Sequence, residues 1–222
     1  MNEHSITVAG GKSVRLKTAG KYCDRDIVVS AIGGGDEGGG VSSNDVEKYF
    51  EDVQHTEVIL PNVENLKQYA FYQDKTITQI TMPKVKSIGA YAFGFCTNLA
   101  LTSLPSNLTS IGRDAFNSCT NLALTSLPSN LTSIGINAFS GCTKLALTSL
   151  PSSLTTIESR AFATCVSLSS LTFKGTPTTI ANNTFTSCTK LLTINVPWAE
   201  GVVANAPWGA TKATINYNYT GE

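Results

Sequence analysis

Histidine and charged side chains are scarce in this sequence. Only His4 and His55 are present among 222 residues, and charged residues make up 14%. Imidazole titrates near neutral pH and is a common metal ligand, so its scarcity argues against a metalloenzyme or a histidine-based catalyst. Sixteen basic residues balance sixteen acidic ones. A chain without net charge has no overall field to attract nucleic acid or an anionic membrane, so we expect neither as a partner.

Long apolar runs and a recognisable leader are also missing. No stretch approaches the roughly 20 apolar residues of a membrane span, so we expect no membrane insertion. The first residues, Met-Asn-Glu-His, lack the basic and apolar parts of a signal peptide, which predicts synthesis in a cytoplasm. Hydrophobic residues reach 41%, enough for a core, while 22 serines and 28 threonines take the place of charge.

Acidic residues almost vanish from residues 83–196, where only Asp114 and Glu158 remain. A glycosidase needs two carboxylates about 5–9.5 Å apart, and nothing else in the sequence supports such a pair. The serines fall in repeats, and no G-x-S-x-G motif is present. The sequence therefore predicts a protein that is not an enzyme, with no catalytic residue, cofactor or metal site.

One regular period dominates what is present. The stretch CTNLALTSLPSNLTSIG occurs unchanged at 96–112 and 119–135, and weaker copies begin near residue 56. A unit of this length cannot bury its own apolar side, so stacked units share one core. The evenly spaced positions are Phe93, Phe116, Phe139, Phe162 and Phe185; Cys96, Cys119, Cys142, Cys165 and Cys188; Leu99, Leu122, Leu145, Leu168 and Leu191; and Ile88, Ile111, Ile134, Ile157 and Ile180.

Each coil is expected to hold two extended pieces and a helical turn. Leu122–Pro128 is rich in β-forming residues and ends at a proline, which cannot continue a ladder. LTSIG at 131–135 predicts a second extended piece, and INAFSGC at 136–142 predicts a short helical turn. We predict a repeat solenoid, mainly β with short helical turns, of about six coils, each about 22–23 residues long. At the strand spacing of about 4.8 Å, six coils form a rod about 30 Å long.

The Ile-Gly, Ala-Phe, Cys, Leu and Leu-Pro positions of this unit resemble the BspA-like leucine-rich repeats. The resemblance covers most of the chain and implies a leucine-rich repeat solenoid over residues 56–196. The common horseshoe pattern L-x-x-L-x-L-x-x-N-x-L is absent. Thr102, Thr125 and Thr148 occupy the position of Leu171 and Ile194, so the strand register there stays open.

Five of the six cysteines follow the repeat, and Cys23 stands apart. Equivalent cysteines on neighbouring coils would fall within the Cα separation of about 4.4–6.8 Å that a disulfide needs. The alternative is a buried ladder of small hydrophobic side chains, because each cysteine lies beside the repeated Phe and Leu. We favour the buried ladder.

The N-terminal part differs in kind. Residues 1–32 predict a small β module of two or three strands with Gly-Gly and Ala-Gly turns. Residues 33–41 are a glycine-rich linker, and 42–55 predict an N-terminal cap that begins with a short amphipathic helix. Part of the module resembles a segment of bacteriophage and prophage tail proteins, which implies attachment to other tail proteins, and the alternative is a hairpin that only caps the solenoid. The residues that carry the resemblance are Thr18, Ala19, Gly20, Lys21, Tyr22, Cys23, Asp24, Arg25, Asp26 and Ile27.

Residues 197–222 break the period and are expected to form a C-terminal cap. They hold both tryptophans, Trp198 and Trp208, whose rings would either seal the last coil or offer a platform for a carbohydrate. The segment VPWAEGVVANAPWGATKATINYNY also resembles the ends of phage structural proteins that carry the same repeat.

The pair after each Ile-Gly position varies among the copies while the core positions stay constant. Residues 83–196 also hold seven basic residues against two acidic ones. A constant core with variable exposed side chains is typical of a binding scaffold, although neutral variation would look the same. The candidate ligand-binding residues are Tyr91, Arg113, Asp114, Asn137, Lys144, Arg160, Asn183, Lys190, Trp198 and Trp208.

These features predict a non-enzymatic phage or prophage tail-associated protein. Residues 1–32 would attach it to the virion tail, and the solenoid would bind a host-surface ligand or a partner protein. A homo-oligomer is a further expectation. Two alternatives stay open: a secreted adhesin of the BspA-like type at the bacterial surface, and an intracellular interaction module such as an inhibitor of a host defence complex.

Overall fold

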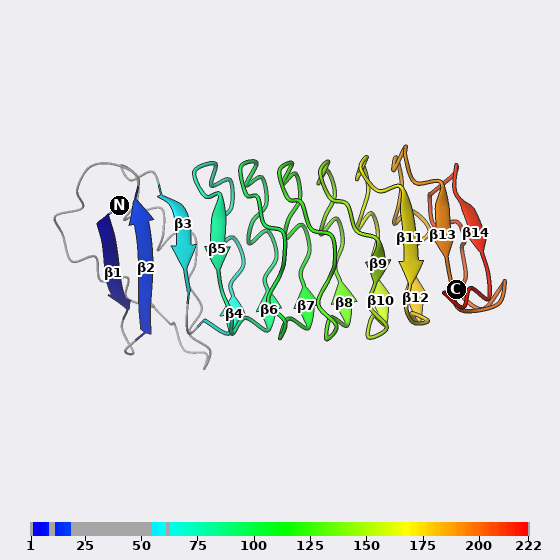
Figure 1. Cartoon of the computed structure of the whole chain (residues 1–222), viewed down its shortest axis with the longest axis horizontal. Helices are drawn as coiled ribbons and strands as arrows, with labels where there is room; N and C mark the ends of the chain where they lie inside the picture. The colour runs from blue at the N-terminus through cyan, green and yellow to red at the C-terminus, as the bar shows by residue number, and fades with distance from the viewer. Residues whose placement is uncertain (1, 9–11, 19–54, 61–62, 222) are drawn as a thin grey trace.

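The computed structural model describes residues 2–8, 12–18, 55–60 and 63–221. Figure 1 shows the strands following one another along the long axis of the molecule, from β1 beside the N-terminus to β14 near the C-terminus. The repeat solenoid predicted from the sequence is confirmed. Within the described ranges there is no helix with the length and hydropathy of a membrane span.

One row of six short parallel strands marks the coils. Each strand consists of a polar residue followed by a buried Leu or Ile. Each residue lies opposite the equivalent residue of the next coil. Ile88, for example, lies opposite Ile111, which lies opposite Ile134. The strands are β4 (Asn65–Leu66), β6 (Ser87–Ile88), β7 (Ser110–Ile111), β8 (Ser133–Ile134), β10 (Thr156–Ile157) and β12 (Thr179–Ile180).

A second row consists of two four-stranded sheets. In the first sheet β1 pairs with β2 and β2 with β3, both antiparallel, and β3 pairs with β5 in parallel. The second sheet is parallel throughout, in the order β14-β13-β11-β9. The bounds are β1 (Asn2–Val8), β2 (Lys12–Thr18), β3 (His55–Ile59) and β5 (Gln79–Thr81), then β9 (Ser149–Leu150), β11 (Ser170–Phe173), β13 (Thr193–Asn195) and β14 (Thr214–Asn216).

The strand predicted at Leu122–Pro128 is not formed. In this coil Leu124 and Leu127 are both buried although three positions separate them. In a regular strand successive side chains point to opposite faces, so residues two positions apart share a face, as the buried Leu171 and Phe173 do in β11. The exposed Thr125 stands where Leu171 is buried. No strand forms here or beside the equivalent Thr102, whereas β9 still forms directly after Thr148.

The helical turn predicted at 136–142 is also wrong. The amides of Asn137, Phe139 and Gly141 donate to carbonyl oxygens of the next coil, and the amides between them donate three residues back. An α-helix would need every amide for a bond four residues back. Pairing between coils takes half of these donors, so the segment folds as consecutive tight turns.

The core consists of stacked ladders of identical side chains. Consecutive phenylalanine rings lie 5.2–5.6 Å apart with interplanar angles of 2–11°. Each stacked pair contributes about 0.5–1.5 kcal/mol beyond the burial of its surface. The ladder consists of Phe71, Phe93, Phe116, Phe139, Phe162 and Phe185, none of them more than 3% exposed.

Threonine hydroxyls bind the coils together at the surface. Thr109 Oγ1 donates to the carbonyl oxygen of Lys86, Thr132 Oγ1 to that of Thr109, and Thr155 Oγ1 to that of Thr132, over 2.9–3.1 Å. The backbone amides of the same three threonines donate to the same oxygens. In this ladder a threonine side chain reinforces each of these backbone bonds between coils.

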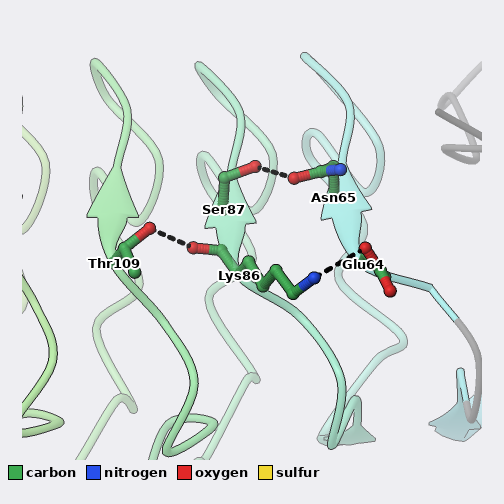
Figure 2. Close-up of polar contacts among 5 residues, drawn as sticks. All are labelled: Glu64, Asn65, Lys86, Ser87 and Thr109. Atoms are coloured by element: carbon green, nitrogen blue, oxygen red, sulfur yellow. Dashed lines mark hydrogen bonds and ion pairs between the residues drawn. The ribbon is translucent and has the colours of Figure 1, made fainter. Parts of the chain in front are cut away.

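Figure 2 shows how this ladder begins at the first coils. The Lys86 ammonium lies 2.9 Å from a Glu64 carboxylate oxygen, and Ser87 Oγ donates to Asn65 Oδ1 over 2.6 Å. Both pairs join one coil to the next, in the same direction as the Thr109 bond. Side chains on this edge are thus engaged between coils.

Strand pairing continues past both ends of the predicted solenoid. The hairpin of β1 and β2 extends the first sheet through β3, and β14 extends the last sheet through β13. The hairpin thus supplies the first two strands of that sheet. The linker at 33–41, the helix near 42–53, a third strand before residue 32 and Cys23 lie outside the described residues.

Candidate functional site

The tight-turn segments lie one beside the next and form one long side of the solenoid. Bonds from Tyr69 N to Ala90 O and from Tyr91 N to Arg113 O, both under 3.0 Å, hold neighbouring segments together. We call this side the turn face. Its segments are 68–73, 90–95, 113–118, 136–141, 159–164 and 182–187.

Backbone conformation on the turn face is unusual and regular. Nearly every segment has two residues in the left-handed region, four positions apart, with φ between 53° and 74°. Asn, Asp and Gly tolerate this region best, and bulky side chains rarely occupy it. The residues are Tyr69 with Gln73, Tyr91 with Phe95, Asp114 with Ser118, Asn137 with Gly141, Arg160 with Thr164, and Ser187 alone in the last segment.

The structure brings three of the candidate residues together around one carboxylate. Asp114 accepts hydrogen bonds from Arg113 Nε at 3.1 Å and from Asn117 Nδ2 at 2.7 Å. Its carboxylate, as hydrogen-bond partner and nearby charge, raises the pKa of Tyr91. Asp114 is only 3% exposed, so its expected place in an exposed variable pair is wrong. Its carboxylate acts as a hydrogen-bond acceptor for Arg113 and Asn117.

Asn137 and Arg160 lie further along the turn face, at a shallow depression of about 390 Å³. Asn183 belongs to the next coil, where its Oδ1 accepts a hydrogen bond from Arg160 N at 3.3 Å. All but one of the lining residues are polar, which suits a hydrogen-bonding ligand better than an apolar one. The lining consists of Asn117, Asn137, Ser140, Arg160, Ala163, Thr164, Thr186 and Ser187.

A cluster of four aromatic residues occupies the N-terminal end of the turn face. Tyr69 and Tyr91 stack with centroids 5.1 Å apart, and Tyr72 stands edge-on to both and to Phe95. Tyr69 is 39% exposed and Phe95 38%. We call Tyr69, Tyr72, Tyr91 and Phe95 the aromatic patch. Of these four residues, only Tyr91 was singled out from the sequence. Aligning the coils would have revealed the others, because these rings stand at positions where other copies carry residues such as Asp, Asn, Ser or Gly.

Lys144 and Lys190 are exposed, but each lies two residues after a ladder cysteine, where the chain has left the turn face. Trp198 and Trp208 are 5% and 0% exposed, so the alternative of a carbohydrate platform there is wrong. Their ring centroids lie 5.3 and 6.0 Å from that of Phe173 and 6.4 Å from each other. Trp208 also stands one repeat after Phe185, so it closes the core where the phenylalanine ladder ends.

The five ladder cysteines are buried, and no disulfide joins them. Each thiol donates a hydrogen bond to a phenylalanine carbonyl oxygen of the preceding coil, over 2.8–3.1 Å. Burial raises the pKa of every thiol in the ladder, that of Cys188 to about 11. Among the described residues, no group of three His, Cys, Asp or Glu side chains is arranged to hold a metal ion.

The repeats match one family over most of their length. Six copies of the BspA type leucine-rich repeat region cover residues 46–166 and 109–200. The chain belongs to the BspA-type leucine-rich repeat family. Among the curated proteins no relative matches the chain.

Solved structures of leucine-rich repeat proteins agree with this family. The T. pallidum protein TpLRR is 31% identical with a TM-score of 0.58, and the alignment covers 64% of this chain and 72% of that one. A protein from Bacteroides ovatus is 30% identical with a TM-score of 0.56, covering 64% and 42%. The pneumococcal vaccine antigen PcpA shares the fold at 22% identity and a TM-score of 0.51, covering 74% and 42%. This chain thus spans less than half of the last two proteins.

The comparisons bear on the repeats and not on the two ends. The family match stops at residue 200 and begins at residue 46. The resemblance of residues 18–27 and of the C-terminal segment to phage proteins gains no support from them.

Proposed function

We propose that this BspA-type repeat protein is a non-enzymatic recognition protein whose turn face binds a partner exposed on a cell surface. The observation that carries the proposal is the contrast along equivalent positions. The Phe rung of the core is unchanged over six coils and the Cys, Leu and Ile rungs over five. One rung of the turn face, by contrast, reads Tyr69, Tyr91, Asp114, Asn137, Arg160 and Asn183. A constant scaffold thus presents different chemistry at each coil.

The bonding between coils supports this role. Alternate amides of each turn segment pair with the next coil, and the phenylalanine stack runs beneath them. The side chains of the turn face are therefore held at fixed spacings before a ligand arrives. A surface organised in advance loses less conformational entropy on binding.

The polar groups described here have structural roles that fit a protein without catalysis. The Asp114 carboxylate anchors Arg113 and Asn117, and a Glu158 carboxylate oxygen accepts a hydrogen bond from Ile136 N at 3.1 Å. The ladder thiols donate to backbone oxygens, and their raised pKa keeps them protonated and poorly nucleophilic.

Attachment to a phage tail through residues 1–32 is a second candidate, resting on the resemblance of that segment. The pairing of β2 with β3 supports a fixed junction, because it joins the hairpin to the first coil. In such an appendage the hairpin end would face the tail, and the turn face would remain available to the host. A secreted adhesin would use the same turn face.

A charge-matched pair of variants tests the proposal. Arg160→Asn replaces a turn-face residue with the side chain that Asn137 and Asn183 supply in neighbouring coils. Lys144→Asn removes one positive charge outside the turn face. Labelled full-length protein is titrated onto a panel of intact bacteria and purified cell walls. We expect saturable binding that Arg160→Asn weakens at least fivefold and Lys144→Asn changes less than twofold.

Two outcomes would contradict this proposal. Equal losses in both variants would move recognition away from the turn face. Absence of saturable binding across the panel, with capture of a protein from host lysate instead, would replace the cell-surface partner by an intracellular one.

A further inference from the structure

The aromatic patch is a built feature that the repeat itself does not require. At the first left-handed position, later coils use Asp114 and Asn137, which tolerate that conformation, while the first two coils use tyrosine at φ of 63° and 57°. At the second position Phe95 adopts φ of 63°, where Gly141 stands two coils later. Arg160 and Thr164, which line the polar depression, are unfavourable in the same way. Residues held in strained conformations concentrate at functional sites.

A glycine makes room for one ring of the patch. A Cβ atom at Gly94 would lie 3.1 Å from Cδ2 and 3.2 Å from Cε2 of Tyr72. Other coils carry Asn117, Ser140 and Ala163 at this position. A side chain here would crowd the Tyr72 ring, so the glycine is a second accommodation to the same cluster.

Hydrogen-bonding groups continue directly from the rings. Tyr91 lies near Asp114, whose negative charge raises the pKa of the tyrosine and whose carboxylate accepts hydrogen bonds from Arg113 and Asn117. Asn117 in turn lines the polar depression that reaches to Thr186 and Ser187. The turn face thus runs from exposed aromatic rings through amides and a guanidinium to hydroxyls.

We propose that the turn face binds an extended glycan, one of whose sugar rings stacks on the aromatic patch while the chain continues along the polar depression. This inference rests on the proposed function and names its ligand class. The C–H face of a pyranose ring packs on an aromatic face, and its hydroxyls pair with planar amide and guanidinium groups. A pyranose unit is also about as long as the 5.2–5.6 Å that separates successive phenylalanine rings of the core ladder, so a periodic chain meets a periodic surface.

A protein partner fits this surface less well. The strongest residues at protein interfaces insert into well-packed pockets from which water is excluded. The depression beside the patch is shallow and lined almost wholly by polar side chains. An apolar anchor from a partner would find no matching pocket there, whereas a chain of hydroxyl groups would find donors and acceptors along its length.

Affinity electrophoresis of the full chain tests the inference. Native gels contain laminarin, xylan, mannan or dextran, and retardation is measured against polysaccharide concentration. The patch variant combines Tyr69→Asn, Tyr91→Asn and Phe95→Ser, each new residue being one that equivalent positions already carry. Tyr219→Asn, near the C-terminus, is the matched control. We expect at least one polysaccharide to retard the protein, with at least tenfold weaker binding by the patch variant and unchanged binding by the control.

The substitutions also separate binding from folding. Relief of the left-handed strain leaves the thermal midpoint of the patch variant within a few degrees of the parent or above it. Phe95→Ser alone serves as a milder variant, because this ring is the most exposed in the second coil of the patch. Its binding is expected to weaken in the same direction.

The outcomes distinguish this inference from the proposal beneath it. Retardation by none of the four polysaccharides, or equal retardation of parent and patch variant, overturns the glycan inference. If Arg160→Asn still weakens binding to bacteria in that case, the proposed function stands and only the glycan inference fails. Binding of a proline decapeptide in place of every polysaccharide would likewise overturn the glycan and assign the rings to a peptide partner.

Discussion

The thiol of Cys119 donates a hydrogen bond to the carbonyl oxygen of Phe93, 2.9 Å away on the preceding coil. The same oxygen accepts the amide of Cys96 at 3.1 Å. Each ladder cysteine repeats this relationship, so the cysteine rung is part of the bonding between coils and not only a filler of apolar space.

Loss of one thiol is therefore expected to destabilise the fold. Cys142 is fully buried, and its Sγ lies 3.0 Å from the carbonyl oxygen of Phe116. Cys142→Ala removes this bond and leaves a small void, which should lower the free energy of unfolding by about 1–2 kcal/mol. Urea denaturation measures the change. The exposed Ser169→Ala is the control, and an equal effect of both variants would show that the thiol bond contributes nothing.

Stability is expected to fall at alkaline pH. Burial raises the pKa of Cys188 from 9.0 to about 11 and raises the pKa values of the other four thiols as well. Above pH 9.0 the unfolded chain loses thiol protons that the folded chain keeps, so the unfolded state is favoured as pH rises. The Cys188 contribution is intact below pH 9.0 and declines until about pH 11.

Denaturation at a series of pH values checks this window. Each thiol adds a slope of up to about 1.4 kcal/mol per pH unit. Cys188→Ala should make the fall of the unfolding free energy between pH 9 and 11 less steep, because the Cys188 thiol no longer contributes to it. A stability that stays constant up to pH 11 would contradict the burial of ionisable thiols in the core.

The threonine ladder is expected to contribute less to the free energy of unfolding, and the same substitution at two threonines measures this contribution. Thr132→Val keeps the shape of the side chain but removes the bond from Oγ1 to the carbonyl oxygen of Thr109, 2.9 Å away. We expect a loss of about 0.5–1 kcal/mol in the free energy of unfolding, because the backbone amide still satisfies that oxygen. Thr125→Val, in the exposed stretch without a strand, should change it by less than about 0.5 kcal/mol. Equal effects at both sites would argue against the ladder.

Trp208 should matter more than any single rung, because it closes the core. It is fully buried, and its Nε1 donates to the carbonyl oxygen of Ala204 at 2.7 Å. Trp208→Ala is expected to cost about 3–5 kcal/mol. In a solenoid each coil contacts only its neighbours, so hydrogen exchange should rise in β13 and β14 and remain unchanged in β6 and β7. The exposed Val202→Ala is the control, and a uniform rise along the chain would contradict the capping role.

Much of the architecture was accessible from spacing alone. The constant step that links Phe93 to Phe116 or Ile111 to Ile134 predicted which side chains are buried and in what order they stack. It could not predict local conformation. The segment 136–142 was predicted to form a helical turn, but pairing with the next coil takes alternate amides and prevents a helix.

The candidate binding surface divides in the same way. The variable rung indicated that Asn137, Arg160 and Asn183 lie along one side, because equivalent residues of a repeat must share a face. Two features lay beyond it: the burial of Asp114 and the gathering of Tyr72 and Phe95 beside Tyr91. Both depend on the directions in which left-handed backbone points the side chains of neighbouring coils, and on the space that Gly94 leaves for one ring.

The sequence by itself determined the period, the core ladders and the membership of a repeat solenoid, because a unit that cannot bury its own apolar side must stack on its copies. The tertiary structure decided where the strands form, how the terminal hairpin joins the first sheet, and which exposed side chains meet. Those outcomes depend on competition between bonds within a coil and bonds to the next coil, and that competition is resolved only when the coils are stacked.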